Sequence, residues 1–238
     1  ANRASRCSSA GGDSDRSAAG FDQTTGGAAF GLDYQRSDEN LIGLLGAYLT
    51  DEVDFDQGRG KTEIDTWQIG TYGQYDTETW YANGILTYGW SDHHSKRRIA
   101  FQSVSDYAKS DYDGTAFVLY GEAGYKYPVG DGITLKPLLG LGYVRVDTDG
   151  FTENGRSHYN LRVKGGSGES LTSNLGARAS LERTTGNGTL ITVDARLLWQ
   201  HEFQHDHQSV DASFAAVPDT SFSVSGSKFG RDSAIFGL

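Results

Sequence analysis

Apolar and polar residues alternate along most of the chain, and this period of two is typical of β-strands. The clearest alternation covers residues 190–203. One face of that run holds Ile191, Val193, Ala195, Leu197 and Trp199. Asp194 and Arg196 fall on the opposite face, so one side of the predicted strand is apolar and the other is charged.

The same alternation recurs along the sequence and predicts an all-β chain, because almost no segment follows the 3.6-residue period of a helix. Strong runs lie at 171–182 and 115–127. Weaker runs lie at 25–35, 41–50, 66–76, 80–91, 133–147 and 221–238. Residues 1–9 hold one more weakly marked strand, so the pattern predicts about ten strands in a single domain over 1–238.

The connections between the predicted strands alternate between short and long. Short turns rich in Gly, Pro, Asn or Asp lie at 37–40, 76–79, 128–132 and 184–188. Long polar loops lie at 10–24, 51–65, 92–112, 148–170 and 205–220. This segregation of loop lengths is typical of an antiparallel up-and-down transmembrane β-barrel in an outer membrane. A soluble sandwich, the alternative for an all-β chain, has no reason to sort its loops by length.

Aromatic residues stand at both ends of the apolar face of residues 80–90. Ten residues at about 3.3 Å each, tilted by about 40°, rise about 25 Å, the height of an apolar band between two aromatic girdles. We expect lipid-facing or girdle positions at Trp80, Tyr88, Trp90, Phe117, Tyr125, Tyr127 and Trp199. The alternate positions place charged side chains in the barrel lumen, at Glu122, Lys126, Arg178, Glu182, Asp194 and Arg196.

Composition narrows the choice of function. The chain carries 21 Lys and Arg against 31 Asp and Glu, and a formal charge of −10 argues against nucleic acid as a partner. The mean hydropathy of −0.50 does not exclude a barrel, because a spanning strand needs an apolar residue only at every second position. Methionine is absent, so we expect the chain to be part of a longer polypeptide, and the lone Cys7 permits no internal disulfide.

One motif offers a competing chemistry. His201, Glu202 and His205 match the zinc-protease pattern H-E-x-x-H, and His207 follows closely. That chemistry needs a helix, where residues four apart share one face, whereas on a strand they lie about 13 Å apart, too far for one metal ion. We therefore expect no metal, no cofactor and no catalytic residue in this chain, and a soluble all-β metallohydrolase remains only as an alternative.

Two neighbouring stretches resemble the C-terminal translocator domain of autotransporters, the type V secretion proteins of Gram-negative bacteria. They are PLLGLGYVRVDTDGFTENG at 137–155 and SLTSNLGARASLE at 170–182. The family pattern there runs P-x-x-x-L-x-Y, then D-x-F-x-E-x-G, then L-x-S-x-L-G-x-R. The matching residues are Pro137, Leu141, Tyr143, Asp149, Phe151, Glu153, Gly155, Leu171, Ser173, Leu175, Gly176 and Arg178. Further stretches agree in order, and the likeness covers about 25–238.

The resemblance implies a twelve-stranded barrel in the outer membrane whose pore is crossed by a helix. That helix links the barrel to an exported N-terminal passenger, and the barrel assembly machinery folds the barrel. Outer-membrane lipids, the passenger with its linker helix and that machinery are thus the partners the resemblance implies. The barrel is not an enzyme in most of the family, although some members cut their own linker inside the pore.

The chain departs from the family pattern at both ends. ANRASRC at 1–7 keeps little of the usual first strand, and the family's last two strands and terminal aromatic residue are absent after Leu238. We therefore expect a fragment with open strand edges that pair with another strand, from the assembly machinery or from a C-terminal segment. A general porin-like channel of the outer membrane is the first alternative function, ahead of the metallohydrolase, because it shares the lumen chemistry.

Overall fold

The computed structural model describes residues 3–4, 8–12, 20–101, 104–156, 158–204, 209–225 and 230–238. These residues form strands and one 3₁₀ turn, η1 (Asp56–Gly58). The strands are β1 (Arg3–Ala4), β2 (Ser8–Gly12), β3 (Phe21–Gln35), β4 (Asn40–Phe55), β5 (Gly60–Asp76), β6 (Trp80–Phe101), β7 (Val104–Tyr125), β8 (Tyr127–Gly130), β9 (Ile133–Thr148), β10 (Phe151–Thr152), β11 (Leu161–Val163), β12 (Gly166–Thr184), β13 (Leu190–Glu202), β14 (Ser209–Phe214), β15 (Val217–Ser225) and β16 (Asp232–Gly237). The all-β prediction is confirmed.

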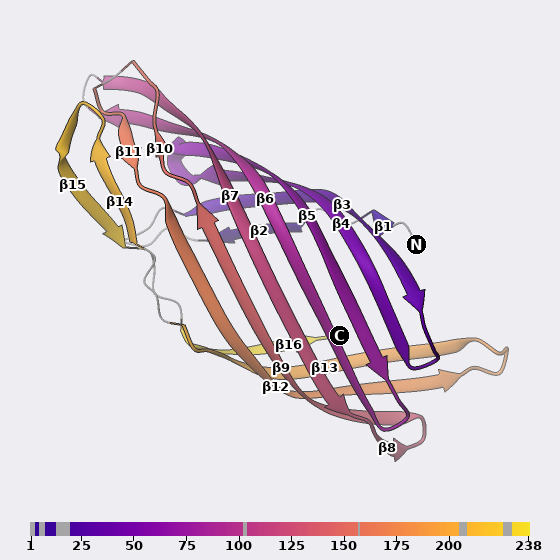
Figure 1. Cartoon of the computed structure of the whole chain (residues 1–238). Coiled ribbons are helices and arrows are strands. Elements are labelled where there is room, and N and C mark those ends of the chain that lie inside the picture. Colours follow the sequence, from indigo (N-terminus) through magenta and orange to yellow (C-terminus); the bar gives the residue numbers. More distant parts are fainter. Residues whose placement is uncertain are drawn as a thin grey trace.

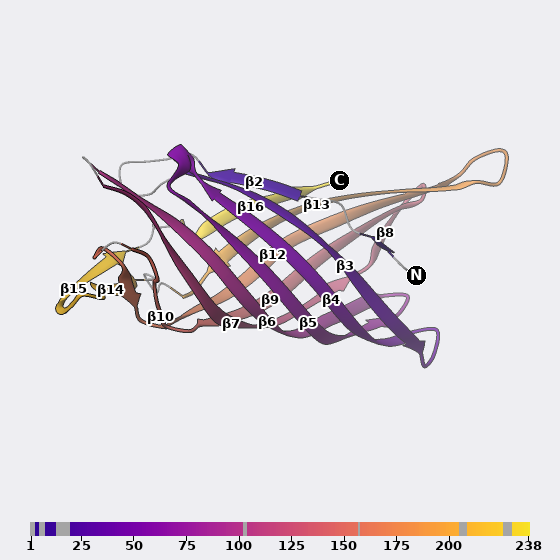
Figure 2. The same cartoon turned by 90° about the horizontal axis from the view of Figure 1, so that it is seen from above.

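Most strands belong to one antiparallel sheet that curls about its long direction (Figures 1 and 2). Its order is β1-β3-β4-β5-β6-β7-β9-β12-β13-β16, with β2 also paired to β3 and β8 to β9. Strands that follow one another in this order run antiparallel, as the up-and-down prediction requires. Within the described part of the chain, no pairing joins β16 to β1, β2 or β3.

A second, smaller sheet of β10, β11, β14 and β15 lies at one end of the long strands, beside the tip of the β6–β7 hairpin (Figure 1). The opposite end carries the short turns. A backbone bond from the Arg36 amide to the Asn40 carbonyl closes the first of them, and one from Thr77 to Trp80 closes the second. Gly130, Asp131 and Gly132 adopt positive φ in the third turn, a conformation that favours glycine.

Several predicted boundaries were wrong, among them the loop at 205–220, which contains β14 and the start of β15. Residues 51–65 and 92–112 were predicted as loops, but most of each belongs to strands, since β4 and β5 meet at η1 and β6 runs on to Phe101. These extensions carry polar residues on both faces, so apolar alternation disappears although the strand continues. The predicted strand at 221–238 is in fact split between β15 and β16, which lie in different sheets.

The distribution of apolar side chains is the reverse of that in a soluble protein. Among the described residues, no large side chain is less than 2% exposed. Large apolar residues instead stand exposed on one face of the main sheet, such as Leu32 at 80%, Leu44 at 64% and Leu197 at 63%. A continuous apolar surface of this kind needs lipid or a partner to cover it. The described residues include no helix long and apolar enough to cross a membrane.

Candidate functional site: a polar cluster on the inner face

The inner face of the sheet, opposite the exposed apolar residues, is packed by tyrosine rings that lie over glycines. A Cβ atom built on Gly43 would lie 2.3 Å from the Tyr72 ring, and one on Gly124 would lie 2.5 Å from Tyr81. Any side chain larger than hydrogen at these glycines would displace the ring that covers it. Tyrosine and glycine thus fix each other's positions across neighbouring strands.

Glu122 of β7 lies at the centre of a polar cluster on this face. Its side chain is only 8% exposed. The Tyr120 hydroxyl donates to Oε2 at 2.8 Å, and the Tyr81 hydroxyl donates to Oε1 at 3.2 Å. The Arg178 guanidinium stands 3.8 Å from Oε1, beyond hydrogen-bond distance. Glu122 is therefore held by two neutral donors and compensated by one nearby cation.

Basic side chains also lie on the inner face of the strands that follow β7 in the sheet. The register of β9, β12 and β13 pairs Lys136 with Arg178 and Arg178 with Arg196, so three basic residues form one transverse row. Asp194 lies one inward position away and accepts a hydrogen bond from the Ser180 hydroxyl at 2.5 Å. A cavity of about 260 Å³ opens beside Arg178, Asp194 and Arg196. The row offers charged groups to a polar chain that passes along the inner face.

The cluster also contains a polar atom without a partner. The Asn174 side chain is 5% exposed, and its Oδ1 accepts no hydrogen bond from the described residues. Asn174 pairs in register with Gly140 on one side and with Gln200 on the other. A buried acceptor left open in this way is available to water or to a donor from another segment.

Four of the six predicted lumen residues therefore lie close together, namely Glu122, Arg178, Asp194 and Arg196. The other two do not join them. Lys126 bonds the Asp76 carboxylate and donates to the Thr77 carbonyl at 2.8 Å, so it stabilises a short turn. Glu182 is exposed near the short-turn end of β12.

The sequence did not reveal the role of the tyrosines in this cluster. Alternation assigns each tyrosine to one face of its strand and does not show which residue it contacts. Tyr81 and Gly124 are direct register partners in the β6–β7 hairpin. Counting outward from the β6–β7 connection would have placed a bulky ring opposite a glycine. Ser180 and Asn174 gave no signal of their own, since small polar residues occur at many strand positions.

The aromatic residues predicted to face lipid lie on the outer face of the sheet or at its margin. Six of them are more than 40% exposed: Trp80, Tyr88, Trp90, Tyr125, Tyr127 and Trp199. Phe117 is half-buried and packs edge-on against Tyr143, with ring centroids 6.1 Å apart. Arg145 begins a charged network beside Phe117, with salt bridges to Asp147 and Glu169 at 2.8 and 2.9 Å. This network ends the apolar band toward the second sheet.

The residues of the H-E-x-x-H motif do not converge where they are described. His201 lies on the outer side of β13, with its Nδ1 2.9 Å from Asp232 Oδ1. Glu202 points to the other face, accepts a hydrogen bond from the Ser170 hydroxyl and also accepts one from the Leu171 amide. His205 and His207 lie outside the described residues. Within the described ranges, no group of three or more His, Cys, Asp or Glu residues is arranged to hold a metal ion.

Comparison with known proteins agrees with this geometry. A family model described as the autotransporter β-domain matches residues 7–238. The chain is 26% identical to an extracellular serine protease of Serratia marcescens, over 92% of this chain and 20% of that protein. It is 27% identical to outer membrane protein A of Rickettsia rickettsii, over 90% of this chain and 10% of that protein. The chain thus spans a fifth or less of the length of these two relatives.

Solved structures show the same fold at lower sequence identity. The translocator domain of the autotransporter NalP from Neisseria meningitidis superposes with a TM-score of 0.64 at 14% identity, over 81% of this chain and 69% of that one. The β-domain of the Bordetella autotransporter BrkA gives a TM-score of 0.63 at 21% identity, over 91% of this chain and 88% of that one.

Proposed function

Because the chain belongs to the autotransporter β-domain family, we propose that it anchors an N-terminal passenger in the bacterial outer membrane and helps export it to the cell surface. The chain is an integral β-barrel domain of the outer membrane. Residues 7–238 match the β-domain, so in this proposal the passenger is another part of the full-length protein. Its linker helix and the barrel assembly machinery are partners that the family suggests.

The contrast between the two faces of the main sheet is the observation that carries this proposal. The outer face exposes large apolar side chains, as a lipid-facing surface must. The inner face gathers Glu122, Arg178, Asp194 and Arg196, which suit a water-filled path for a polar polypeptide. Charged groups on this path keep contacts with a moving chain hydrophilic and reversible, because water competes for each of them.

We assign no catalytic step to the domain. The name of the Serratia marcescens relative describes a whole protein, of which this chain matches 20%. In our proposal any such activity belongs to the passenger, and the barrel serves as anchor and conduit. Linker cleavage inside the pore would need a nucleophile or a carboxylate aimed at the linker. Glu122 is instead occupied by two tyrosine hydroxyls.

Surface proteolysis tests the proposal. Cells that express the full-length protein are treated with a protease that cannot enter the periplasm, and the passenger is followed by immunoblotting. We expect the passenger to be cut in intact cells and this domain to remain in the outer-membrane fraction. A passenger that is cut only after the outer membrane is permeabilised would contradict the proposal.

Ion conductance separates the porin-like alternative from the translocator. The full-length protein is reconstituted in planar bilayers with and without the proposed linker segment. A translocator whose pore holds its linker passes little current until that segment is removed, whereas a general porin conducts equally in both forms. Equal conductance would therefore favour the channel.

A further inference from the structure

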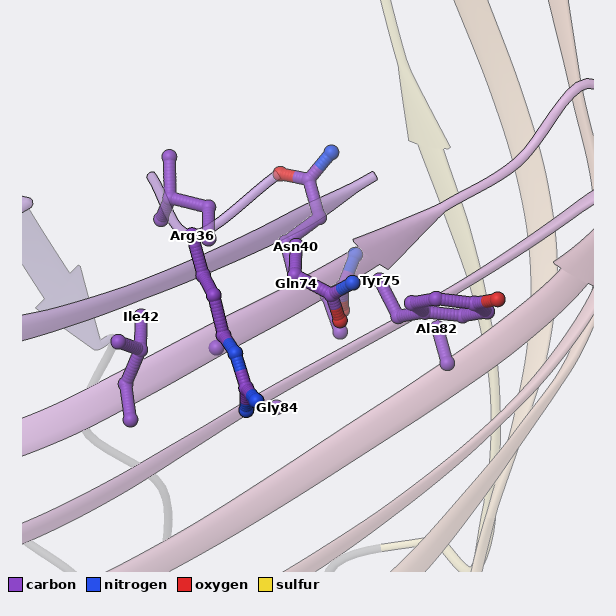
Figure 3. Close-up of a pocket in the computed structure, with 10 residues that line it drawn as sticks. Arg36, Asn40, Ile42, Gln74, Tyr75, Ala82 and Gly84 are labelled. Carbon is purple, nitrogen blue, oxygen red and sulfur yellow. The ribbon is translucent and has the colours of Figure 1, made fainter. Parts of the chain in front are cut away.

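A cavity of about 440 Å³ opens on the outer face at the short-turn end of β4, β5 and β6 (Figure 3). Its lining is mainly apolar and includes Arg36, Ile42, Gly73, Tyr75, Ala82 and Gly84. Ile42 is 56% exposed, which places the cavity among the apolar residues of the outer surface.

The cavity exists because small residues meet there in register. Gly73 of β5 pairs with Ile42 on one side and with Gly84 on the other. A Cβ atom on Gly73 would lie 3.6 Å from the Leu41 carbonyl oxygen, and one on Gly84 would lie 3.4 Å from that of Tyr120, with no side chain in reach. These two glycines are therefore uncovered, unlike Gly43 and Gly124 of the inner face.

Among the described residues, Arg36 is the one cation that lines the cavity. Its side chain extends past Ile42 toward Gly84 in Figure 3. Within the described part of the chain, its guanidinium has neither a carboxylate partner nor a hydrogen-bond acceptor. A guanidinium at the edge of an apolar surface is stabilised by an anion with two acceptor oxygens, and a phosphodiester matches that geometry.

Nearby aromatic residues indicate the depth of the site in the membrane. Tyr75 packs on Trp80 with ring centroids 4.8 Å apart, and both lie at the short-turn end. Tyrosine and tryptophan rings collect at the level of lipid headgroups, and short turns of outer-membrane barrels lie on the periplasmic side. A headgroup of the periplasmic leaflet, which is made of phospholipid, is thus within reach of Arg36.

We propose that this cavity binds one phospholipid of the periplasmic leaflet, with its phosphodiester on Arg36 and an acyl chain over Gly73 and Gly84 against Ile42. The site rests on the outer-membrane location given above. Charge complementarity selects the occupant, because the lining joins the Arg36 cation to a mainly apolar floor, and a phospholipid supplies both an anion and an acyl chain. Free phosphate has no apolar group that could cover the floor of the cavity.

Native mass spectrometry of the protein extracted from outer membranes in mild detergent tests the site. Arg36→Gln removes the cation, and Gly84→Val fills the floor without a steric clash. Arg183→Gln and Gly46→Val are the matched controls. Arg183 is an exposed arginine near the same end, and a Cβ atom on Gly46 would meet only Gln68 and Phe30, at 3.9 and 4.0 Å, outside the cavity.

We expect the share of protein that carries a phospholipid to fall about tenfold in Arg36→Gln, the effect of losing one charge-assisted bidentate contact. Gly84→Val should reduce it by a similar factor, and both controls should stay within about twofold of the wild type. Added phosphatidylethanolamine should restore binding to the delipidated wild type, whereas inorganic phosphate should not bind.

Two results would overturn the site. In one, Arg36→Gln retains as much phospholipid as the wild type. In the other, all four variants lose it equally, which would mean that the loss does not come from this cavity. Surface proteolysis of the same strains separates the two proposals. If the passenger is displayed but lipid binding is not specific, only the proposed lipid site is wrong. If the protein is absent from the outer membrane, both proposals are wrong.

Discussion

Two nearly buried glutamates show how differently one carboxylate can be used in this molecule. Glu153 is 6% exposed and Glu122 is 8% exposed. Arg97 grips Glu153 with two hydrogen bonds, from Nε at 2.7 Å and Nη2 at 2.6 Å, and the Leu161 amide adds a third at 2.7 Å. Glu122 receives two tyrosine hydroxyls, while its arginine stands off at 3.8 Å.

The difference follows from what each residue must hold. Glu153 fixes the second sheet to the β6–β7 hairpin, where Tyr112 is also stacked between His93 and Phe151 with centroids 4.7 and 4.4 Å apart. Three hydrogen bonds hold the Glu153 carboxylate in this contact. The Arg178 guanidinium keeps donors free on the inner face, and under the proposed function these donors serve as transient partners of the exported polypeptide.

Removing the carboxylate of Glu153 should produce the largest loss of stability. Glu153→Ala leaves Arg97 without its bidentate partner, and the loss of two hydrogen bonds between charged groups costs about 3 to 5 kcal/mol. We expect the second sheet to detach, so that amide exchange becomes fast at 151–163 while the main sheet stays protected. Glu52→Ala is the control, because the side chain of Glu52 is 48% exposed and its salt bridge to Lys61 lies at the surface. Unchanged protection at 151–163 would show that the clamp is dispensable.

The two faces of β13 should differ almost as strongly. Arginine at Leu197, whose side chain is 63% exposed on the outer face, should cost about 2 to 4 kcal/mol if it lies near the midplane of the bilayer. Arginine at Asp194 should cost much less, because that position lies on the inner face beside Ser180. Urea unfolding in detergent or liposomes measures both. Equal costs, or the reverse order, would refute the assigned faces.

Glu122→Gln should have a smaller effect than any change at Glu153. The amide keeps the shape of the side chain and one acceptor for a tyrosine hydroxyl, so we expect a loss of about 1 kcal/mol. The same urea titration measures it, and Glu153→Gln provides the direct comparison. A loss at Glu122 equal to that at Glu153 would mean that Glu122 is also a structural clamp.

The sequence predicted those parts of the fold in which the two faces of a strand meet different surroundings. Leu197 and Asp194 could be assigned to faces because lipid and polar lumen select opposite residue types. The same logic failed at 92–98, where both faces of β6 are polar, and the strand was therefore predicted to end near residue 91. Period-two alternation reports a contrast of environment, and a strand without that contrast gives no signal.

The candidate site was predictable only in part, because its contacts cross strands that the sequence does not place in register. Glu122 and Arg178 were assigned to the same face, but their proximity depends on β9 lying between β7 and β12. The sequence shows the family pattern at Phe151, Glu153 and Gly155 but does not explain why these residues are needed there. The structure supplies a reason, since Phe151 stacks on Tyr112, Glu153 binds Arg97, and a Cβ atom on Gly155 would lie 2.7 Å from the Tyr107 carbonyl oxygen.

The smallest predicted effect concerns an exposed pair at the same end of the molecule as Glu153. The Nδ1 atom of His94 lies 2.7 Å from Asp111 Oδ1, and the side chains are 56% and 81% exposed. The hydrogen bond to Asp111 raises the pKa of His94 above its ordinary value. The pair therefore stabilises the fold at pH values below the ordinary histidine pKa of about 6.5, and the contribution is lost as the pH rises through the raised pKa.

Exposure to solvent limits this contribution to less than about 1 kcal/mol, far below that of the Glu153 clamp. NMR titration of the His94 imidazole measures the pKa directly. We expect Asp111→Asn to lower it toward the ordinary value, and Asp113→Asn, which alters the carboxylate facing His93, to leave it unchanged. An unaltered His94 pKa in Asp111→Asn would show that solvent screens even this short contact. A charge contact at this surface would then contribute nothing measurable, and the strength of the Glu153 clamp would depend on the burial of its carboxylate.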